Sequence, residues 1–588
     1  MKMEYWNERG KIMKKNHQNK LLCLAWLIIL CSSGCYIDIY DFYNVPEYAT
    51  AWIPLKLNAY AAVSSNYLWN FDPDVRWSIK NAGTTQAKIK DGYLIAMAPG
   101  TVVVSLNAGA SSGAMVKDEL TKLYSITVYP ASEEIQILGT ELISHNVNTA
   151  DNPIQLKVNI KLEVQWEALL NMLIIADRYV NLDFTGSTGT LIPGLSGSSK
   201  LKDEKVLSIV LPESITRIGS YAFSCYNGIT SVSMGNNISD IGHHAFNNCY
   251  NLTEIIIPDS VTSIEHSAFA NCYGLTSVII SNNITGISKD IFYNCYSLTG
   301  VIIPDGVIDI GDKAFYNCFT LTGIIIPDSV TSMGKSVFYG CSNLKAIDVS
   351  NGNTMFSTID GILYDKTATS LIYCPTGKTG IINIPDTVTR IEDSAFNGCG
   401  SLTGVIIPDS VISIGDSAFK DCGSLTSVII PDSVISIEAF TFNGCGNLTG
   451  VNISDNVTGI GKSAFSNCSS LTNVIIPDSV TNIDNYAFFN CSSLINVIIP
   501  DNVTNIGEYA FDDCNSLTGV VIGNKVETIK KNAFNCSKLV MVTLNGTITQ
   551  NGFDDKAFTG DLRLVYFANS GGKGTYTRKS DSTRWNKQ

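Results

Sequence analysis

Residues 298–318 read Leu298-Thr-Gly-Val-Ile-Ile-Pro-Asp-Gly-Val-Ile-Asp-Ile-Gly-Asp-Lys-Ala-Phe-Tyr-Asn-Cys318. Copies of this pattern recur through residues 207–544, and in two uninterrupted sets their phenylalanine returns every 23 residues. The first set is Phe223, Phe246, Phe269, Phe292, Phe315 and Phe338, and the second is Phe396, Phe419, Phe442, Phe465, Phe488, Phe511 and Phe534. A fixed short period predicts a solenoid, because each unit can bury its apolar residues only against its neighbours.

Each unit is predicted to form one flattened coil with three apolar sides. Stacked coils would form a parallel β-ladder over a continuous core. The expected inward residues are Leu298, Val301 and Ile303 on the first side, Val307 and Ile310 on the second, and Ala314 and Phe315 on the third, in a short helical turn.

The cysteines share the period of the phenylalanines. Most of the 17 cysteines stand three residues after a phenylalanine, as Cys318 does after Phe315, and so take the same inward position in successive coils. A thiol there acts as a small apolar group. Neighbouring coils bring such residues within disulfide range, but parallel side-chain directions disfavour the bond. We therefore expect free buried thiols, and the absence of CxxC pairs disfavours a zinc ladder.

Composition bounds the class of protein. The chain has 588 residues, 45% of them hydrophobic, and a formal net charge of −13. This charge argues against a nucleic-acid partner, because such binding depends on Lys and Arg at phosphates. No His-Glu-x-x-His, Gly-x-Ser-x-Gly or Gly-x-Gly-x-x-Gly motif occurs, so neither an enzyme nor a cofactor is expected.

Residues 1–35 are predicted to be an export signal. Residues 21–30 form an apolar run of signal-peptide length that is too short to span a bilayer. Met13, followed by two lysines, would make a better start than Met1. The end of the segment, Ser32-Ser-Gly-Cys35, resembles a bacterial lipobox, which implies lipidation of Cys35, although the lipobox usually has Leu where Ser32 stands. An ordinary signal peptide and a retained anchor remain alternatives.

Residues 36–131 alternate apolar and polar residues in short stretches that are typical of strands. Val75-Arg-Trp-Ser78 and Gly100-Thr-Val-Val-Val104 resemble the bacterial immunoglobulin-like group 2 domain, a small β-sandwich that usually acts as a spacer. Residues 132–200 are expected to be a linker and N-terminal cap, with a helix from Trp166 and a strand over residues 179–184.

The repeat itself resembles the BspA-like, or Treponema-type, leucine-rich repeat of bacterial surface proteins. The resemblance covers residues 201–345 and 381–544 and implies a mainly β solenoid of 23-residue coils, each with one strand and a short turn or helical segment. Where commoner leucine-rich repeats have an Asn ladder, this chain has residues such as Ser329 and Ser410. The family implies adhesion to host matrix proteins or to other cells, but supplies no defined binding residues.

Two segments depart from the period. Phe338 and Phe396 are 58 residues apart, which is 23 plus 35, so residues 346–380 are predicted to be an extended repeat. Within it, residues 361–375 are expected to form a hairpin that leaves the stack. Residues 545–588 are predicted to be a C-terminal cap and tail.

The outward position of the first strand gives the predicted protein-binding residues. They are Ile256, Ile279, Ile302, Ile325, Ile406, Ile429, Ile475 and Ile498, continued by Val521 and interrupted by Asp348 and Asn452. Threonines such as Thr276 and Thr299 flank the row. One interpretation is that these β-branched residues stabilise the sheet. The other is a contact surface for a protein, because a long exposed aliphatic row is unusual on a soluble monomer.

Two other rows leave alternatives open. Aspartates recur at the strand exit, where they favour a turn or would bind divalent cations in a calcium-dependent adhesin. They are Asp259, Asp305, Asp328, Asp386, Asp409, Asp432, Asp455, Asp478 and Asp501. His243 and His266 share one coil position, which Lys289 and Asp312 occupy next, so this edge is interpreted as solvated rather than as a metal site.

The sequence as a whole predicts a lipid-anchored protein of the cell envelope, at the outer membrane or the cell surface. Its partner would be a host extracellular-matrix protein or glycoprotein, or another bacterial cell. A structural or self-associating envelope protein is the rival prediction.

Overall fold

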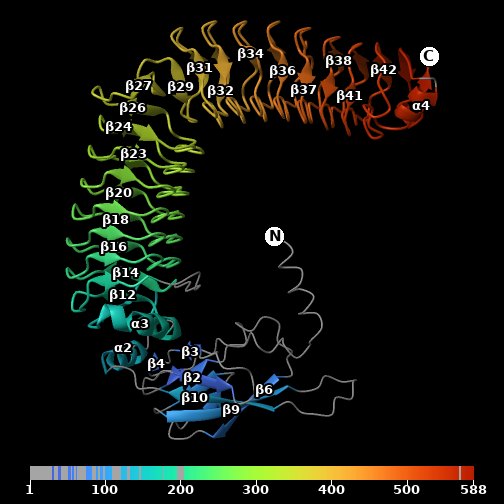
Figure 1. Cartoon of the computed structure of the whole chain (residues 1–588). Coiled ribbons are helices and arrows are strands. Elements are labelled where there is room, and N and C mark those ends of the chain that lie inside the picture. The colour runs from blue at the N-terminus through green and yellow to red at the C-terminus, as the bar shows by residue number, and fades with distance from the viewer. Residues whose placement is uncertain are drawn as a thin grey trace. The chain divides into compact units, whose positions relative to one another are not determined.

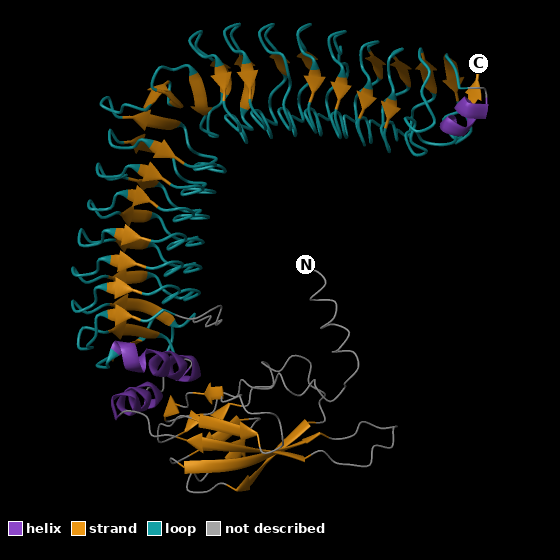
Figure 2. Cartoon of the chain, in the orientation of Figure 1, coloured by secondary structure: helices purple, strands orange, loops and turns teal. Residues whose placement is uncertain are grey.

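The computed structural model describes residues 133–144, 148–176, 178–194, 204–568 and 571–588, and before residue 133 only the backbone of strands β1–β10. The chain divides into two compact units, Met1–Ile238 and Ser239–Gln588. Figure 1 labels the elements along the chain, and Figure 2 colours them by type. Among the described residues, no helix combines the length and the apolar character needed to cross a membrane.

Strands β1–β10 belong to the first unit. Their bounds are Leu30–Cys31, Ile37–Asp41, Ala51–Ile53, Lys56–Leu57, Ala61–Ala62, Val75–Asn81, Lys88–Lys90, Tyr93–Ala96, Gly100–Ala108 and Thr121–Val128. One sheet has the order β3-β2-β10-β9-β6, with antiparallel pairs throughout. Apart from the backbone of β1, the predicted export signal lies outside the described residues, as do Cys35 and the side chains of the immunoglobulin-like segment, so those assignments stay predictions.

The first unit continues with two helices and the first coils. Its elements are α2 (Glu133–Ser144), β11 (Ile154–Lys157), α3 (Leu162–Ala176), β12 (Val180–Asp183), β13 (Leu191–Ile192), β14 (Val206–Val210), β15 (Arg217–Ile218) and β16 (Ser231–Ser233). The sequence indicated α3 and β12 but not α2. In α3, Trp166 is 3% exposed, and its ring lies 5.7 Å from that of Phe184 and 5.6 Å from that of Phe223. The helix therefore packs on the aromatic core of the first coils.

Two short strands, one on each of two sides, recur along the coils of the second unit (Figure 1). The first side has β18 (Glu254–Ile256), β20 (Ser277–Ile279), β22 (Gly300–Val301), β24 (Gly323–Ile326), β26 (Ala346–Val349), β30 (Gly380–Asn383), β32 (Leu402–Ile406), β34 (Ser427–Ile429), β35 (Gly450–Asn452), β38 (Asn496–Ile499), β40 (Gly519–Ile522) and β42 (Met541–Leu544). The second side has β17 (Asp240–Ile241), β19 (Ser263–Ile264), β21 (Gly286–Ile287), β23 (Asp309–Ile310), β25 (Ser332–Met333), β31 (Arg390–Ile391), β33 (Ser413–Ile414), β36 (Gly459–Ile460), β37 (Asn482–Ile483), β39 (Asn505–Ile506) and β41 (Thr528–Ile529). Pairing between coils is parallel on both sides, as in β18 with β20 and β17 with β19.

The third side of each coil is a short turn segment, one of the two forms that the sequence predicted. No helix occupies the Ala-Phe segment in any described coil, and turns take its place (Figure 2). Two residues per coil have a left-handed backbone, as Lys313 (φ 53°) and Asn317 (φ 58°) do on either side of Phe315. A left-handed residue ends a helical turn after a few residues. The segment therefore bends twice instead of extending into a helix.

The core confirms the period read from the sequence. In the second unit, Phe rings of successive coils stack at 4.8–5.9 Å between centroids from Phe246 to Phe338 and from Phe396 to Phe558. Leu298, Ile303, Val307, Ile310 and Ala314 are buried as predicted, whereas Val301 is half-buried.

The cysteines of the described coils are free thiols, as predicted, and those from Cys249 to Cys536 are buried. Their sulfur atoms also have a polar partner. From Cys272 onward most thiols donate to the carbonyl oxygen of the phenylalanine in the preceding coil, at 2.9–3.4 Å between sulfur and oxygen. The cysteine therefore supplies a small apolar volume and a donor to a buried carbonyl, which alanine or valine could not do.

The extended repeat forms the predicted antiparallel hairpin, but this hairpin stays in the stack, which corrects the prediction that it leaves. This repeat contains three strands, β27 (Phe356–Ile359), β28 (Ile362–Asp365) and β29 (Ser370–Tyr373). β28 pairs antiparallel with both β27 and β29, and β29 pairs parallel with β31 of the next coil. Leu371 is fully buried. The Tyr373 ring lies 5.9 Å from that of Phe338, and Cys374 N donates to Ala395 O as the Phe amides do elsewhere. The strand β29 thus takes the place of one side of a regular coil, and its side chains pack in the core.

The C-terminal segment closes the last coil. Its elements are α4 (Leu562–Ala568), β43 (Gly574–Thr577) and β44 (Asn586–Lys587). β43 pairs antiparallel with β42, and so ends the parallel ladder. The guanidinium of Arg578, which is 8% exposed, donates to the carbonyls of Leu539 and Ser537 at 2.6 and 3.1 Å, and lies over the ring of Trp585.

Candidate functional site: the outward isoleucine row

The isoleucine row lies on the outer face of the first-side strands. In β18, Ile255 is 1% exposed and Ile256 is 60% exposed, because successive side chains of a strand point to opposite faces. All eight predicted residues are exposed, from 57% at Ile279 to 85% at Ile302. The structure thus places every one of them at the surface, as predicted.

The register sets which members of the row are neighbours. Ile256 pairs with Ile279, and Val278 pairs with Val301, which places Ile302 beside Ile279. Ile325 is paired with Asp348, which ends this first block. In the coils after the extended repeat, Ile429 meets Asn452 and Ile498 meets Val521. The row is therefore divided into blocks. The longest run of exposed isoleucines in successive coils is Ile256, Ile279, Ile302 and Ile325, although its sheet is interrupted between β22 and β24.

The threonines beside the row serve the scaffold. Thr276 Oγ1 donates to Thr253 O at 2.9 Å, and Thr299 Oγ1 donates to Thr276 O at 3.1 Å. The same bond recurs in the later coils at Thr426 and Thr449. Their hydroxyls bridge successive coils, so the sheet-stabilising interpretation holds for the threonines.

A second group of exposed isoleucines was missed from the sequence. Ile308, Ile412 and Ile435 are 51%, 60% and 63% exposed and lie beside the second-side strands. Val307 and Ile310 are buried, whereas Ile308 and Asp309 between them are exposed, so simple alternation along a strand would not have found Ile308. Other coils have threonine at this position, for example Thr331.

The aspartate row contributes to contacts between coils. Asp259 Oδ1 accepts the backbone N–H of Asn282 at 2.9 Å, and Asp501 Oδ1 accepts that of Asn524 at 2.9 Å. At Asp259 and Asp501 the bonds run to the next coil and not to the turn that follows each aspartate, where the sequence had placed them. Ser329 and Ser410, at the position of the usual Asn ladder, likewise donate to Val307 O and Val388 O of the preceding coil.

Stacked tyrosines form a feature that sequence reasoning did not single out. Tyr250, Tyr273 and Tyr296 stack at 4.6 Å between ring centroids, and Phe319 continues the stack at 4.8 Å. A second stack of Tyr293, Tyr316 and Tyr339 has spacings of 4.9 Å. Burial, followed by the neighbouring phenols, raises the pKa of Tyr273. The 23-residue spacing of these tyrosines would have revealed both stacks.

Comparison with known proteins identifies the family. A family model described as the BspA type leucine rich repeat region matches residues 197–320, 262–367, 369–494 and 458–570. These matches cover more than half of the chain. The chain belongs to the BspA-type leucine-rich-repeat family. The matching model describes a repeat region and not an enzyme, and the mainly β solenoid is the fold it implies.

Solved structures include similar proteins. A leucine-rich cell surface protein from Faecalibacterium prausnitzii A2-165 is 30% identical, with 64% of this chain and 91% of that chain covered and a TM-score of 0.45. A leucine-rich repeat protein from Eubacterium ventriosum ATCC 27560 is 25% identical over 59% and 88%, with a TM-score of 0.45. One from Bacteroides ovatus ATCC 8483 is 24% identical over 70% and 85%, with a TM-score of 0.41. No curated protein is matched by this chain.

Proposed function

We propose that this chain is a non-catalytic, surface-displayed binding protein of the adhesin type. Its partner is a host extracellular-matrix protein or glycoprotein, or the surface of another bacterial cell. The block of Ile256, Ile279, Ile302 and Ile325 supports this proposal, because aliphatic side chains remain exposed at the same outward position of four successive coils. An exposed apolar patch of this kind is typical of protein-contact surfaces.

The predicted export signal and lipidation of Cys35 fit the same function, because they would hold the repeats outside the cell. The similar protein of Faecalibacterium prausnitzii is described as a cell surface protein, which supports surface display of this chain. The BspA-type repeat region, as a regular scaffold, presents the same outward position in coil after coil and suits the binding of an extended partner.

The experiment is adhesion of the purified chain to immobilised matrix proteins. Ile302→Lys combined with Ile325→Lys places two charges in the longest block and should abolish adhesion, because each lysine would have to be desolvated at the contact. The matched control is Ile412→Lys with Ile435→Lys, two residues of similar exposure beside the second-side strands. Unchanged melting temperatures would show that both variants fold. Adhesion that survives the first pair of substitutions would contradict the proposed surface.

Self-association is the second candidate function, and the same row favours it. The two ends of the repeat array are covered, by α3 in the first unit and by β43 in the second, which disfavours end-to-end association and leaves the exposed isoleucine row as the face proposed for a second copy. Sedimentation of the chain measures its oligomeric state and so distinguishes adhesion from self-association. A monomer that adheres supports the first proposal, and a dimer that Ile302→Lys with Ile325→Lys dissociates supports the second.

A further inference from the structure

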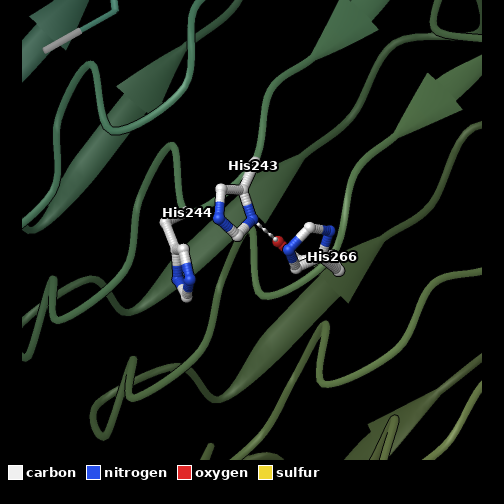
Figure 3. Close-up of side chains that lie close together, drawn as sticks. All are labelled: His243, His244 and His266. Carbon is white, nitrogen blue, oxygen red and sulfur yellow. Dashed lines mark hydrogen bonds between the residues drawn. The ribbon is translucent and has the colours of Figure 1, made fainter. Parts of the chain in front are cut away.

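Three of the five histidines meet at one edge of the second unit. His243 and His244 follow β17, and His266 follows β19 in the next coil. Figure 3 shows His243 between the other two side chains. Ring centroids are 3.6 Å apart for His243 and His266 and 4.0 Å apart for His243 and His244. One ring nitrogen from each histidine lies within 4.8 Å of the nitrogens of the other two.

The coil geometry produces this convergence without a local distortion. His243 and His266 are one period apart, so they occupy the same position in adjacent coils. His244 has φ 53°, but Ser267 and Asp290, at the same position in later coils, have φ 57° and 54°. The left-handed turn thus belongs to every coil, and here it presents a third imidazole beside the other two.

Hydrogen bonding fixes the tautomer of the central histidine. His243 Nδ1 lies 3.2 Å from the backbone oxygen of His266 (Figure 3). Because a carbonyl oxygen only accepts, Nδ1 carries the proton and the lone pair of the neutral ring is on Nε2. Metal-binding histidines commonly donate their second N–H to a backbone carbonyl in this way, which orients the ring.

Two carboxylates stand beside the cluster. Glu265 Oε2 accepts the backbone N–H of His243 at 3.0 Å, and the carboxylate of Asp290 lies 3.9 Å from Lys289 Nζ. Imidazole binds a metal in its neutral form, and nearby carboxylates offset the charge of a dication.

We propose that His243, His244 and His266 form a Zn²⁺ site with three imidazole ligands and one open coordination position. Imidazole suits zinc, and a zinc ion with three protein ligands keeps a fourth position for water or a donor from a partner. Bond lengths of about 2.0–2.1 Å require the nitrogens to approach to about 3.3 Å. Small side-chain rotations achieve this, because His266 is exposed and its ring is not enclosed.

Bound zinc would join two adjacent coils, since its ligands come from both. The proposed adhesion does not depend on this site, because the isoleucine row lies on the first-side strands and the histidines lie beyond the second-side strands. The two proposals can therefore fail separately.

The test is titration of the full chain with zinc alone, in competition with a chromogenic chelator. Removal of outer-shell partners already costs about 10–100-fold in metal affinity, so loss of a ligand should cost at least as much. We expect this loss in His266→Gln and in His244→Asn, where asparagine also accepts the left-handed backbone. Lys289→Gln, at the same coil position as His266, is the matched control and should retain the affinity.

Co²⁺ gives a second readout, because tetrahedral coordination produces strong visible absorption bands. The bands should appear with the parent chain and with Lys289→Gln, and disappear with His266→Gln. Zinc binding that persists unchanged in both histidine variants would assign the metal to other residues and overturn the proposal. Absence of binding to the parent chain would overturn it as well.

Discussion

The two runs of coils, from Phe246 to Phe338 and from Phe396 to Phe534, share one core and differ at the surface. Both stack their phenylalanines and bury their cysteines in the same geometry. Four residues after the phenylalanine, the first run has the aromatic stack of Tyr250, Tyr273, Tyr296 and Phe319, whereas the second run has Gly400, Gly423, Gly446, Ser469 and Ser492. The three histidines also belong to the first run.

This difference shows which positions the solenoid constrains. A buried ring must fit between the rings of two neighbouring coils, so the core position cannot vary without loss of packing in three coils. A turn position that faces water meets only its equivalents in the adjacent coils and can be aromatic in one run and glycine in another. Chemistry specific to one run is therefore to be sought at the turns, as with the tyrosines and the histidines.

The largest expected effect tests whether the two cores are equivalent. Phe292→Ala and Phe465→Ala should each destabilise the chain by about 3–5 kcal/mol, because each creates a cavity between stacked rings. Urea unfolding measures the loss. Alkylation of the cysteines shows which run of coils is destabilised. Burial raises the pKa of Cys272 and of Cys445 to about 12, so these thiols stay unreactive until their coils open. A much smaller loss in one run would show that the cores are not equivalent.

The end of the second run should be the next most sensitive place. Arg578→Ala removes charged hydrogen bonds to the carbonyls of Leu539, Ser537 and Cys536 and should cost about 2–4 kcal/mol. Faster hydrogen exchange in the last coils, with little change in the first run, is the expected result. Arg584→Ala is the control, because Arg584 is exposed. An equal increase in both runs would contradict a local capping role.

The left-handed turns allow a matched comparison of the runs. Gly340 in the first run and Gly444 in the second both have φ 77°, and an added Cβ would meet the side chain of Asn317 or Asp421. Gly340→Ala and Gly444→Ala should each cost about 1–2 kcal/mol, mainly through the backbone. Thermal unfolding of both checks this. Gly423→Ala, with open space at its Cβ, should be neutral or slightly stabilising.

The smallest effect concerns the aromatic stack itself. Tyr273→Ser, which copies the residue type of the second run, should cost about 0.5–1.5 kcal/mol through loss of stacking on Tyr250 and Tyr296. A double-mutant cycle between Tyr250 and Tyr273 measures the coupling free energy. The reverse change, Gly423→Tyr, should give no gain because Gly400 and Gly446 offer no ring. A gain there would mean that stacking is not what distinguishes the runs.

Much of the fold was predictable because every coil places the same residue types at the same buried positions. The 23-residue step of Phe, Cys and Leu is visible in the sequence, and burial follows from it directly. The outward isoleucines were predictable for the same reason, since alternation along a strand is a local property. The blocks in that row were visible only as interruptions by Asp348 and Asn452.

Other features depend on contacts that the sequence does not display. The two bends of the Ala-Phe segment, as at Lys313 and Asn317, are set by left-handed backbone conformation and not by residue spacing. The extended repeat stays in the stack because Leu371 and Tyr373 can fill the core position that a missing coil side would leave empty. In the extended repeat, packing against adjacent coils outweighed the local pattern.

The sequence by itself determined a solenoid of stacked coils, its core residues, its free buried thiols and its outward isoleucines, because each follows from a periodicity of one chain segment. Only the tertiary structure decided that His244, which is outside the shared register of His243 and His266, converges with them. The left-handed turn brings its side chain to the same point, and the direction of a turn is set by backbone conformation rather than by residue spacing.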